Sequence, residues 1–215
     1  MIANECVSKG LNQYTPSIDD PWDQRKIQHL FLRTGFGIAP EEIDQYLQST
    51  PHGLIDFLVD QAVDLPLPAK PDWADKVLAD YNDQNEAVQD ILEWASQWLS
   101  DMWDYGLREK MALFWHNHFV TQIDVYFCPS YLYSYHRLLQ KYALGNFRDL
   151  TYEMGKDPAM LIYLNGVQNT RFDPNENYAR ELFELFTLGR DNNYTQNDIT
   201  EAARALTGWN GFSEA

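Results

Sequence analysis

The sequence has few cysteines and no long apolar run. Cys6 and Cys128 are its only cysteines. They form no CxxC pair and match no zinc spacing, so neither a disulfide framework nor a thiolate metal site is predicted, although one disulfide between them stays open. No apolar run reaches the length of a transmembrane helix, and residues 1–15 lack the basic start and apolar segment of a signal peptide. We therefore expect a soluble chain that carries no signal peptide.

Positive charge is also scarce. The chain has 16 Lys and Arg residues against 32 Asp and Glu residues, which gives a formal net charge of −16. The basic residues are scattered, so the chain should repel phosphate backbones and anionic lipid surfaces. The sequence therefore predicts no nucleic-acid binding and no membrane insertion. The simplest role of the excess of acidic residues is to keep the protein soluble.

Apolar and aromatic residues are abundant. Hydrophobic residues make up 45% of the chain and aromatic residues 14%, with seven Trp and thirteen Tyr. This composition is typical of folded globular proteins, and 215 residues can bury one sizeable core. Aromatic richness indicates a large core, but it also suits a surface for carbohydrate or a partner.

Apolar residues recur at helical spacing along most of the chain, and no alternating strand pattern of useful length occurs. We predict an all-α fold with a single domain of about eight to ten packed helices over residues 21–212, after a flexible arm over residues 1–20. A connector with three prolines spans residues 65–73. Asp20 and Pro21 are predicted to open the first helix, and Gly106 to interrupt the helices in mid-chain. Further helices are predicted over residues 83–103, 129–144, 147–154, 158–164 and 195–206.

The segment from Asp173 to Gly189 is predicted to be the central helix. Asp173 can cap it, Pro174 suits the first helical position, and Glu176 stands three residues after the cap. Gly189 suits the left-handed residue that ends a helix. An apolar stripe at helical spacing should face the aromatic helices around Trp98, Trp115 and Tyr131. It consists of Tyr178, Leu182, Leu185 and Phe186.

A polar stripe on a neighbouring face of this helix is the first candidate site. Glu181 and Glu184 are three residues apart, so they are neighbours on a helix, and Arg180 lies beside them. The two carboxylates could share a metal, or one could act as a base while Arg180 binds an anionic group. One alternative is a solvated, ion-pairing face. Another is a structural network that also includes Asn175, Glu176 and Asn177.

Two histidines in the segment FWHNHF form the second candidate site. Neutral imidazoles are good metal ligands, so His116 and His118 are candidate metal ligands. Positions two apart on a helix diverge by about 200°, so both could bind one metal only if the helix ends or distorts here. The pattern lacks the HExxH spacing of zinc enzymes. The alternative is that one histidine is hydrogen-bonded among the neighbouring aromatic residues while the other lies at the surface.

Five segments in the same order resemble the bacterial domain-of-unknown-function family 1800. They are HLFLRTGFG, FWHNHF, MLIYLNG, NENYARELFELFTLG and YTQNDITEAARALTGW, and they cover most of residues 27–209. The resemblance implies that the chain is an N-terminal portion, because family members are usually longer and continue past the last of these motifs. It also implies a periplasmic or secreted location and a secreted, sulfatase-like protein as partner, since members are commonly encoded beside such a protein and many carry export signals.

Two functions from different classes follow. The first is a non-catalytic binding or assembly module that acts with a secreted partner. The second is a metal-assisted hydrolase, with a divalent metal as its cofactor, in which the candidate residues surround one polar pocket. In that case the histidines would be ligands, Glu181 or Glu184 a base or ligand, and Arg180 the group that holds an anion. If the candidate side chains converge on one pocket that solvent can reach, the enzyme is favoured. If they form hydrogen bonds and ion pairs with one another and are closed to water, the module is favoured.

Overall fold

The computed structural model describes residues 13–209, and it confirms the predicted all-α class. Helices joined by turns and coil account for this part of the chain, in which no residue is assigned to a strand. Most of the predicted arm, and Cys6 with it, lies outside the described residues, whereas Cys128 is a buried free thiol. None of the helices in residues 13–209 is long and apolar enough to cross a membrane.

The elements are helices joined by turns and by longer loops, such as those over residues 65–77 and 169–176. In chain order they are α1 (Gln24–Thr34), the 3₁₀-helix η1 (Pro40–Tyr46), α2 (Pro51–Asp64), the 3₁₀-helix η2 (Leu78–Asp80), α3 (Gln84–His118), α4 (Ile123–Tyr126), α5 (Pro129–Lys141), α6 (Phe147–Met154), α7 (Pro158–Tyr163), the 3₁₀-helix η3 (Gly166–Gln168), α8 (Asn177–Glu181), the π-helix η4 (Leu182–Thr187) and α9 (Gln196–Ala205).

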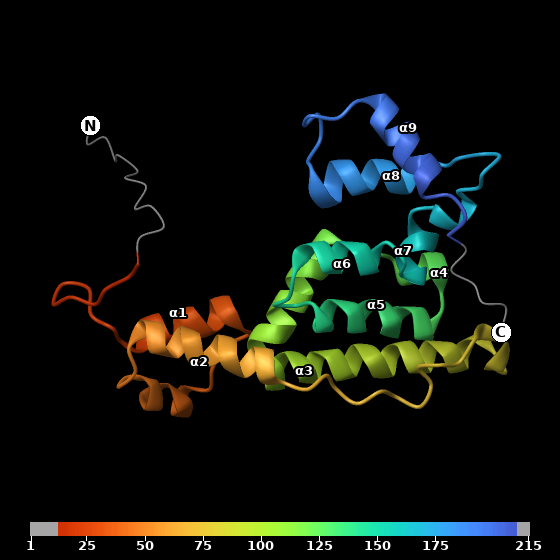
Figure 1. Ribbon diagram of the computed structural model, residues 1–215. Helices are drawn as coiled ribbons and strands as arrows, with labels where there is room; N and C mark the ends of the chain where they lie inside the picture. Colours follow the sequence, from red (N-terminus) through yellow and green to blue (C-terminus); the bar gives the residue numbers. More distant parts are fainter. Residues whose placement is uncertain (1–12, 210–215) are drawn as a thin grey trace, which may run out of the picture.

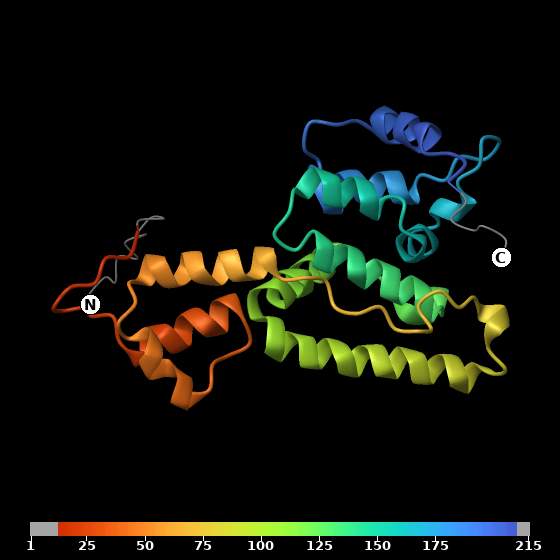
Figure 2. The same ribbon diagram turned by 60° about the horizontal axis from the view of Figure 1, so that its bottom comes forward.

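The helices form layers on the long helix α3. Figure 1 shows α3 along the base with α5 beside it, α6 and α7 above α5, and α8 with α9 outermost. The pair α1 and α2 extends to one side, and both helices contact α3. The turned view in Figure 2 keeps this order of layers. The fold therefore has a taller block built on α3 and a lower helical arm.

The predicted interruption at Gly106 is confirmed as a kink between the two helical segments that make up α3. Helix α3 continues from Gln84 to His118, and Gly106 inside it has φ 37° and ψ −101°, which is not a helical conformation. The strongly positive φ is one that glycine adopts without the steric cost that a Cβ would bring. The glycine therefore allows one helix to follow two directions, so that its second half can carry the segment FWHNHF into the block.

Replacing this glycine should destabilise the protein. We expect Gly106→Ala to lower the free energy of unfolding by about 1–3 kcal/mol, because alanine must adopt a sparsely populated backbone conformation there. Chemical denaturation followed by circular dichroism measures the change. Ser100→Ala on the exposed surface of the same helix is the control and should change stability by less than about 0.5 kcal/mol. Equal stability of Gly106→Ala and the wild type would contradict the assigned strain.

Several helix ends lie where local signals predicted them. Helix α6 has the predicted bounds, and α9 begins after Thr195, whose side chain forms a capping box with Asp198. The first helix is an exception, because α1 begins at Gln24. The side chain of Asp23, not that of Asp20, accepts the capping hydrogen bond from the backbone N–H of Lys26. The predicted start at Asp20 and Pro21 was therefore wrong.

The central helix also begins later than predicted. Helix α8 starts at Asn177, so Asp173 does not cap it and Pro174 is not its first residue. The backbone N–H of Asp173 instead donates to the Thr170 hydroxyl at 3.1 Å, within a loop. The side chain of Asn175 accepts from the backbone N–H of Asn177 at 2.9 Å and thereby satisfies one free donor at the helix start. The predicted capping box was therefore wrong.

The second half of this helix is a π-helix, which the apolar spacing did not predict. The backbone N–H of Leu188 donates to the carbonyl of Phe183, five residues earlier, at 2.9 Å. The wider turn changes the register of the side chains, so Leu185 is exposed while Phe186 is buried. Leu185 therefore does not belong to the buried stripe. The end of the segment was predicted correctly, because Gly189 has φ 87°.

The main core lies between the second half of α3 and helices α5 to α8. Tyr178 and Phe186 belong to it, and Trp115 and Tyr131 pack against it as expected. Trp98 instead packs against the ring of His136, with centroids 4.3 Å apart. Each large apolar side chain buried here contributes roughly 1.5–3 kcal/mol, so this core dominates stability. Its other buried members are Ala112, Phe119, Tyr126, Tyr135, Leu139, Leu150, Met154, Ala159, Met160 and Leu164.

The proline-rich connector is bound along the block. Arg108 Nη1 of α3 donates to the carbonyl oxygen of Pro66 at 2.7 Å, and Arg137 Nη2 of α5 donates to that of Pro68. At the end of the connector Trp73 is buried, with its ring edge-to-face with Trp94 at 6.1 Å. The connector is therefore held to α3 and α5 at several points.

Candidate functional site

The polar stripe of α8 binds the neighbouring helix α9. Arg180 Nη2 lies 2.9 Å from Glu176 Oε2 and donates to Gln196 Oε1 at 3.0 Å, while its Nη1 is 3.4 Å from Glu184 Oε1. Glu176 also accepts hydrogen bonds from Gln196 and from the Thr200 hydroxyl, both at 2.7 Å. Arg180 and its two carboxylates are thus partnered within the protein, and the contacts to Gln196 and Thr200 join α8 to α9.

The surroundings of Glu176 and Glu181 shift the pKa values of these two carboxyl groups in opposite directions. The hydrogen bonds from Thr200 and Gln196 lower the pKa of Glu176 below its usual value. Burial raises the pKa of Glu181, and the nearby Glu184 carboxylate raises it further, while Arg180 lowers it. Glu176 is thus an ionised acceptor that holds α9. The raised pKa of Glu181 is caused mainly by its partial burial.

The asparagines beside the stripe form a chain of hydrogen bonds. Asn177 Nδ2 donates to the carbonyl of Leu164 at 3.0 Å. The backbone N–H of Asn175 donates to Asn169 Oδ1 at 3.0 Å, and Asn169 Nδ2 donates to the carbonyl of Ala203 at 2.8 Å. These contacts connect the loop before α8 to the end of α7 and to α9. Asn169, which is 3% exposed, is the centre of the chain and was not singled out from the sequence.

The two histidines of FWHNHF contact different partners. His118 Nε2 lies 3.0 Å from the carbonyl oxygen of Phe186, to which it donates, whereas His116 Nδ1 lies 2.8 Å from the hydroxyl of Tyr135. Residues 13–209 contain no group of three or more His, Cys, Asp or Glu side chains arranged to hold a metal ion. The cavity that His116 lines is not lined by Arg180, Glu181 or Glu184. The metal site at His116 and His118 therefore stays a prediction, without a third ligand in this part of the chain.

The hydrogen bonds of Tyr135 determine the tautomer of His116. The Tyr135 hydroxyl donates its only hydrogen to the carbonyl of Phe119 at 2.7 Å. Its oxygen must therefore accept from His116, which places the imidazole hydrogen on Nδ1 and leaves a lone pair on Nε2. Burial lowers the pKa of His116, which favours the neutral ring. His116 thus presents a neutral imidazole with a hydrogen-bond acceptor at Nε2.

His116 lines a cavity of about 440 Å³ between α3, α4 and α5. The walls combine aromatic and aliphatic side chains, and His136 adds a second imidazole that is only 2% exposed. Both ring nitrogens of His136, and the indole nitrogens of Trp94 and Trp98, are buried without a hydrogen-bond partner in the described part of the chain. Burial is the main cause that lowers the pKa of His136 to about 3, so its ring is neutral at pH 7.

A second polar cluster is fully buried behind this cavity. Glu109 of α3 is 0% exposed and accepts from Arg108 Nε at 2.9 Å and from Gln140 Nε2 of α5 at 3.0 Å. Its Oε2 lies 3.9 Å from Nε2 of His136. Burial raises the pKa of Glu109, and the bonds from Gln140 and Arg108 oppose this rise. The cluster is enclosed, and it joins α3 to α5.

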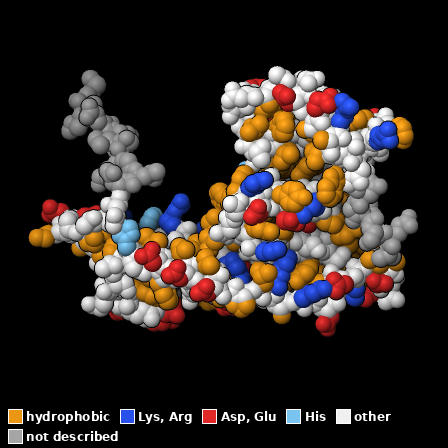
Figure 3. All heavy atoms as spheres, in the orientation of Figure 1, with side chains coloured by type: hydrophobic (Ala, Val, Ile, Leu, Met, Phe, Trp, Pro, Cys, Tyr) orange, Lys and Arg blue, Asp and Glu red, His pale blue; other side chains and the backbone are white. Residues whose placement is uncertain are grey.

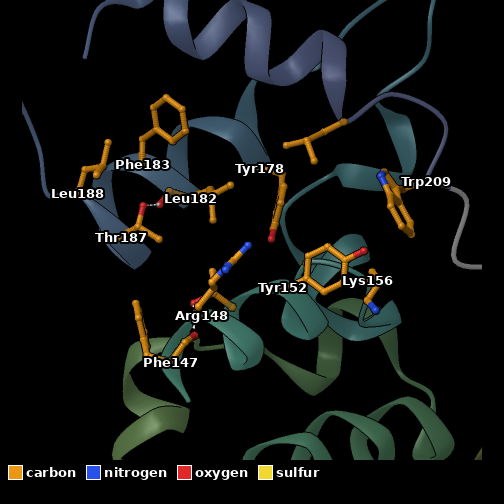
Figure 4. A pocket seen from close by; sticks show the side chains of 13 residues that line it. Phe147, Arg148, Tyr152, Lys156, Tyr178, Leu182, Phe183, Thr187, Leu188 and Trp209 are labelled. Carbon is orange, nitrogen blue, oxygen red and sulfur yellow. Dashed lines mark hydrogen bonds between the residues drawn. The ribbon is translucent and has the colours of Figure 1, made fainter. Parts of the chain in front are cut away.

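An apolar groove of about 510 Å³ separates α6 from the π-helix. Figure 4 shows its side chains from both walls, and Figure 3 shows apolar side chains gathered on the taller block between the levels of α6 and α8. The walls include Phe147 and Tyr152 from α6, Leu182 and Phe183 from the π-helix, Leu188, and Trp209 at the end. Sequence reasoning missed this groove, because its walls come from segments that are distant in the chain.

Arg148 adds positive charge to this groove. It extends from α6 toward the wall formed by α8 (Figure 4), and its guanidinium forms no ion pair within residues 13–209. Lys156 also lines the groove, but it is paired with Glu153 at 2.6 Å. The groove thus combines apolar walls with one unpaired cation, in a protein whose net charge is strongly negative.

A comparison with known families gives one match. A family model described as "Protein of unknown function (DUF1800)" matches residues 29–213. No curated protein and no solved structure matches the chain. The matched range includes both histidines of FWHNHF, the polar stripe of α8 and both walls of the apolar groove.

Proposed function

Because the chain belongs to the DUF1800 family, whose description gives no activity, we propose a function from the geometry: a helical binding or assembly module. The observation that supports this proposal most is the apolar groove between α6 and the π-helix. Large apolar surfaces that stay open to solvent mark interaction sites in soluble proteins. The polar stripe supports the same reading, because Arg180 pairs with Glu176 and Glu184 within the protein.

The groove suits a short amphipathic segment of a protein partner. Apolar side chains of the partner would enter between Tyr152 and Leu182, and a carboxylate would pair with Arg148. Such a segment buries its apolar face in the groove and keeps its polar face in water. The π-helix contributes directly, since its wider turn places Leu182, Phe183 and Thr187 along one wall. A secreted, sulfatase-like protein is the partner that we propose, with a periplasmic or secreted location.

A pair of substitutions tests this function. Leu188→Glu places a charge on the wall of the groove, whereas Leu99→Glu places the same charge on an exposed leucine of α3 that does not line the groove. We expect Leu188→Glu to reduce the amount of sulfatase-like protein that co-purifies with the chain by about tenfold or more, as for a residue central to an interface. Leu99→Glu should leave that amount unchanged.

The measurement is quantitative co-purification after co-expression, with the unfolding midpoint of each variant as a check on folding. Arg148→Gln should weaken the complex and make it less sensitive to salt, because it removes the proposed ion pair. Full binding by Leu188→Glu, or equal losses for both leucine variants, would show that the groove is not the interface. Absence of a complex with the wild-type chain would refute the proposed partner.

A further inference from the structure

The cavity beside His116 has the chemistry of a small-molecule site, separate from the apolar groove. Its volume of about 440 Å³ lies within the range of ligand pockets. It combines aromatic walls with a few polar groups, which is the usual composition of such pockets. Its aromatic and polar lining includes Trp94, Trp98, His116, Asp124, Tyr135 and His136.

One hydrogen-bond acceptor in this cavity, Nε2 of His116, has a fixed orientation. The chain of bonds from His116 Nδ1 to Tyr135 and on to the carbonyl of Phe119 orients the imidazole and keeps its hydrogen on Nδ1. Nε2 makes no hydrogen bond to any residue of the described range. A ligand that donates an N–H or O–H to this nitrogen would complete the chain.

Other polar atoms around the cavity lack partners. The His136 ring offers one donor and one acceptor when it is neutral, and neither nitrogen is bonded within residues 13–209. The indoles of Trp94 and Trp98 offer two further donors without partners. Buried polar groups without partners cost about 1–3 kcal/mol each, so a ligand that carries oxygen acceptors as well as donors would relieve this cost.

The charges around the cavity favour a cation. No Lys or Arg is among its described lining residues, whereas Asp124 on the exposed side of α4 brings a carboxylate. Arg108 and Arg137 contribute to the lowered pKa of His136, but neither lines the cavity: Arg108 binds Glu109 and Pro66, and Arg137 binds Pro68 and Gln140. The Trp98 ring adds an electron-rich face, and tryptophan is the best aromatic partner for a cation. The net charge of −16 also disfavours an anionic ligand.

We propose that this cavity binds a small organic ammonium ion that also carries hydroxyl groups, such as an amino sugar. The ammonium N–H donates to Nε2 of His116, and Asp124 balances the charge from the exposed side of the cavity. The indole and imidazole N–H groups are closed to solvent, so a small rotation of these rings on binding is part of the proposal and lets the hydroxyl oxygens accept from them. The apolar face of the sugar ring packs on Trp98.

Glucosamine and glucose form a matched pair of probes, because they differ in one ammonium group. Titration of the ¹⁵N-labelled chain with glucosamine should shift the indole signals of Trp94 and Trp98 saturably and leave those of the other tryptophans in place. We expect glucose to bind at least about tenfold more weakly, since hydrogen bonds to charged groups are stronger than neutral ones. Equal binding of both sugars would overturn the proposed ammonium site in favour of a neutral-sugar site, and no indole shift with either would overturn the site itself.

Variants locate the ligand within the cavity. Asp124→Asn, at an exposed position, should weaken glucosamine binding several-fold without changing stability. His116→Ala should weaken it about tenfold or more, and His29→Ala on the exposed surface of α1 is the matched control. His116→Ala also removes a hydrogen-bond partner of buried Tyr135 and could unfold the protein. In that case the glucosamine affinity of Asp124→Asn tests the proposed site. Unchanged glucosamine affinity in Asp124→Asn would contradict the proposed charge balance.

Discussion

Glu109→Ala is expected to lower the free energy of unfolding by about 3–5 kcal/mol, because it breaks a buried ion pair. Glu109 is fully buried, and its carboxylate accepts from Arg108 and from Gln140. Removing it leaves the Arg108 guanidinium without its charge partner at a site that is only 3% exposed. It also leaves the Gln140 amide without an acceptor, and a cavity opens between α3 and α5.

Urea denaturation followed by circular dichroism measures this loss. Glu201→Ala is the matched control, since Glu201 pairs with Arg204 at 2.8 Å on the exposed face of α9 and should contribute less than about 1 kcal/mol. Glu109→Gln keeps the shape and one acceptor oxygen, so its loss should be smaller than that of Glu109→Ala. If Glu109→Ala were no less stable than Glu201→Ala, the buried cluster would not hold α3 to α5.

Asn169→Ala should lower the free energy of unfolding by about 2–4 kcal/mol, because one buried and one partly buried backbone group lose their partners. The Asn169 side chain donates to the carbonyl of Ala203 and accepts from the N–H of Asn175. Its backbone carbonyl also accepts from Gly208 at 3.1 Å, a bond that alanine retains. The loss should therefore loosen the contact of α9 with the loop before α8 while the rest of the block stays folded.

Hydrogen exchange of backbone amides distinguishes this local effect from general destabilisation. In Asn169→Ala the amide of Asn175 should exchange faster, whereas amides in α5 should keep their protection relative to the global stability. Asn117→Ala is the matched control, since Asn117 is exposed and donates only to the carbonyl of Leu113 within its own helix. A loss in Asn169→Ala no larger than the control's would contradict the central position of Asn169.

Local signals predicted much of the fold. The all-α class follows from helical periodicity, and the ends of α6 and α9 follow from caps that lie next to the helices they begin. The predicted start of α8 was wrong because the backbone N–H of Asp173 donates to Thr170 in a loop. The side chain of Asn175 instead accepts a hydrogen bond from the backbone N–H of Asn177 at the helix start. The π-helix has no signal in apolar spacing, which assumes 3.6 residues per turn.

The candidate sites were harder to predict, because their contacts join distant segments. The spacing of Arg180 and Glu184 correctly placed them as neighbours on one helix, but Glu176 binds Thr200, which lies 24 residues away. The tautomer of His116 depends on Tyr135 of another helix, and no local pattern contains that information. Both the groove and the cavity are lined by segments that come together only in the folded chain.

The bound connector has a mechanical consequence. A proline-rich coil between helices would ordinarily act as a hinge, yet here the carbonyls of Pro66 and Pro68 are held by arginines from two different helices. Any force that pulls the pair α1 and α2 away from the block acts on their direct contacts with α3, and also on these two guanidinium contacts and on buried Trp73. The connector therefore attaches the arm to the block, so a force on the arm is transmitted to α3 and α5 together.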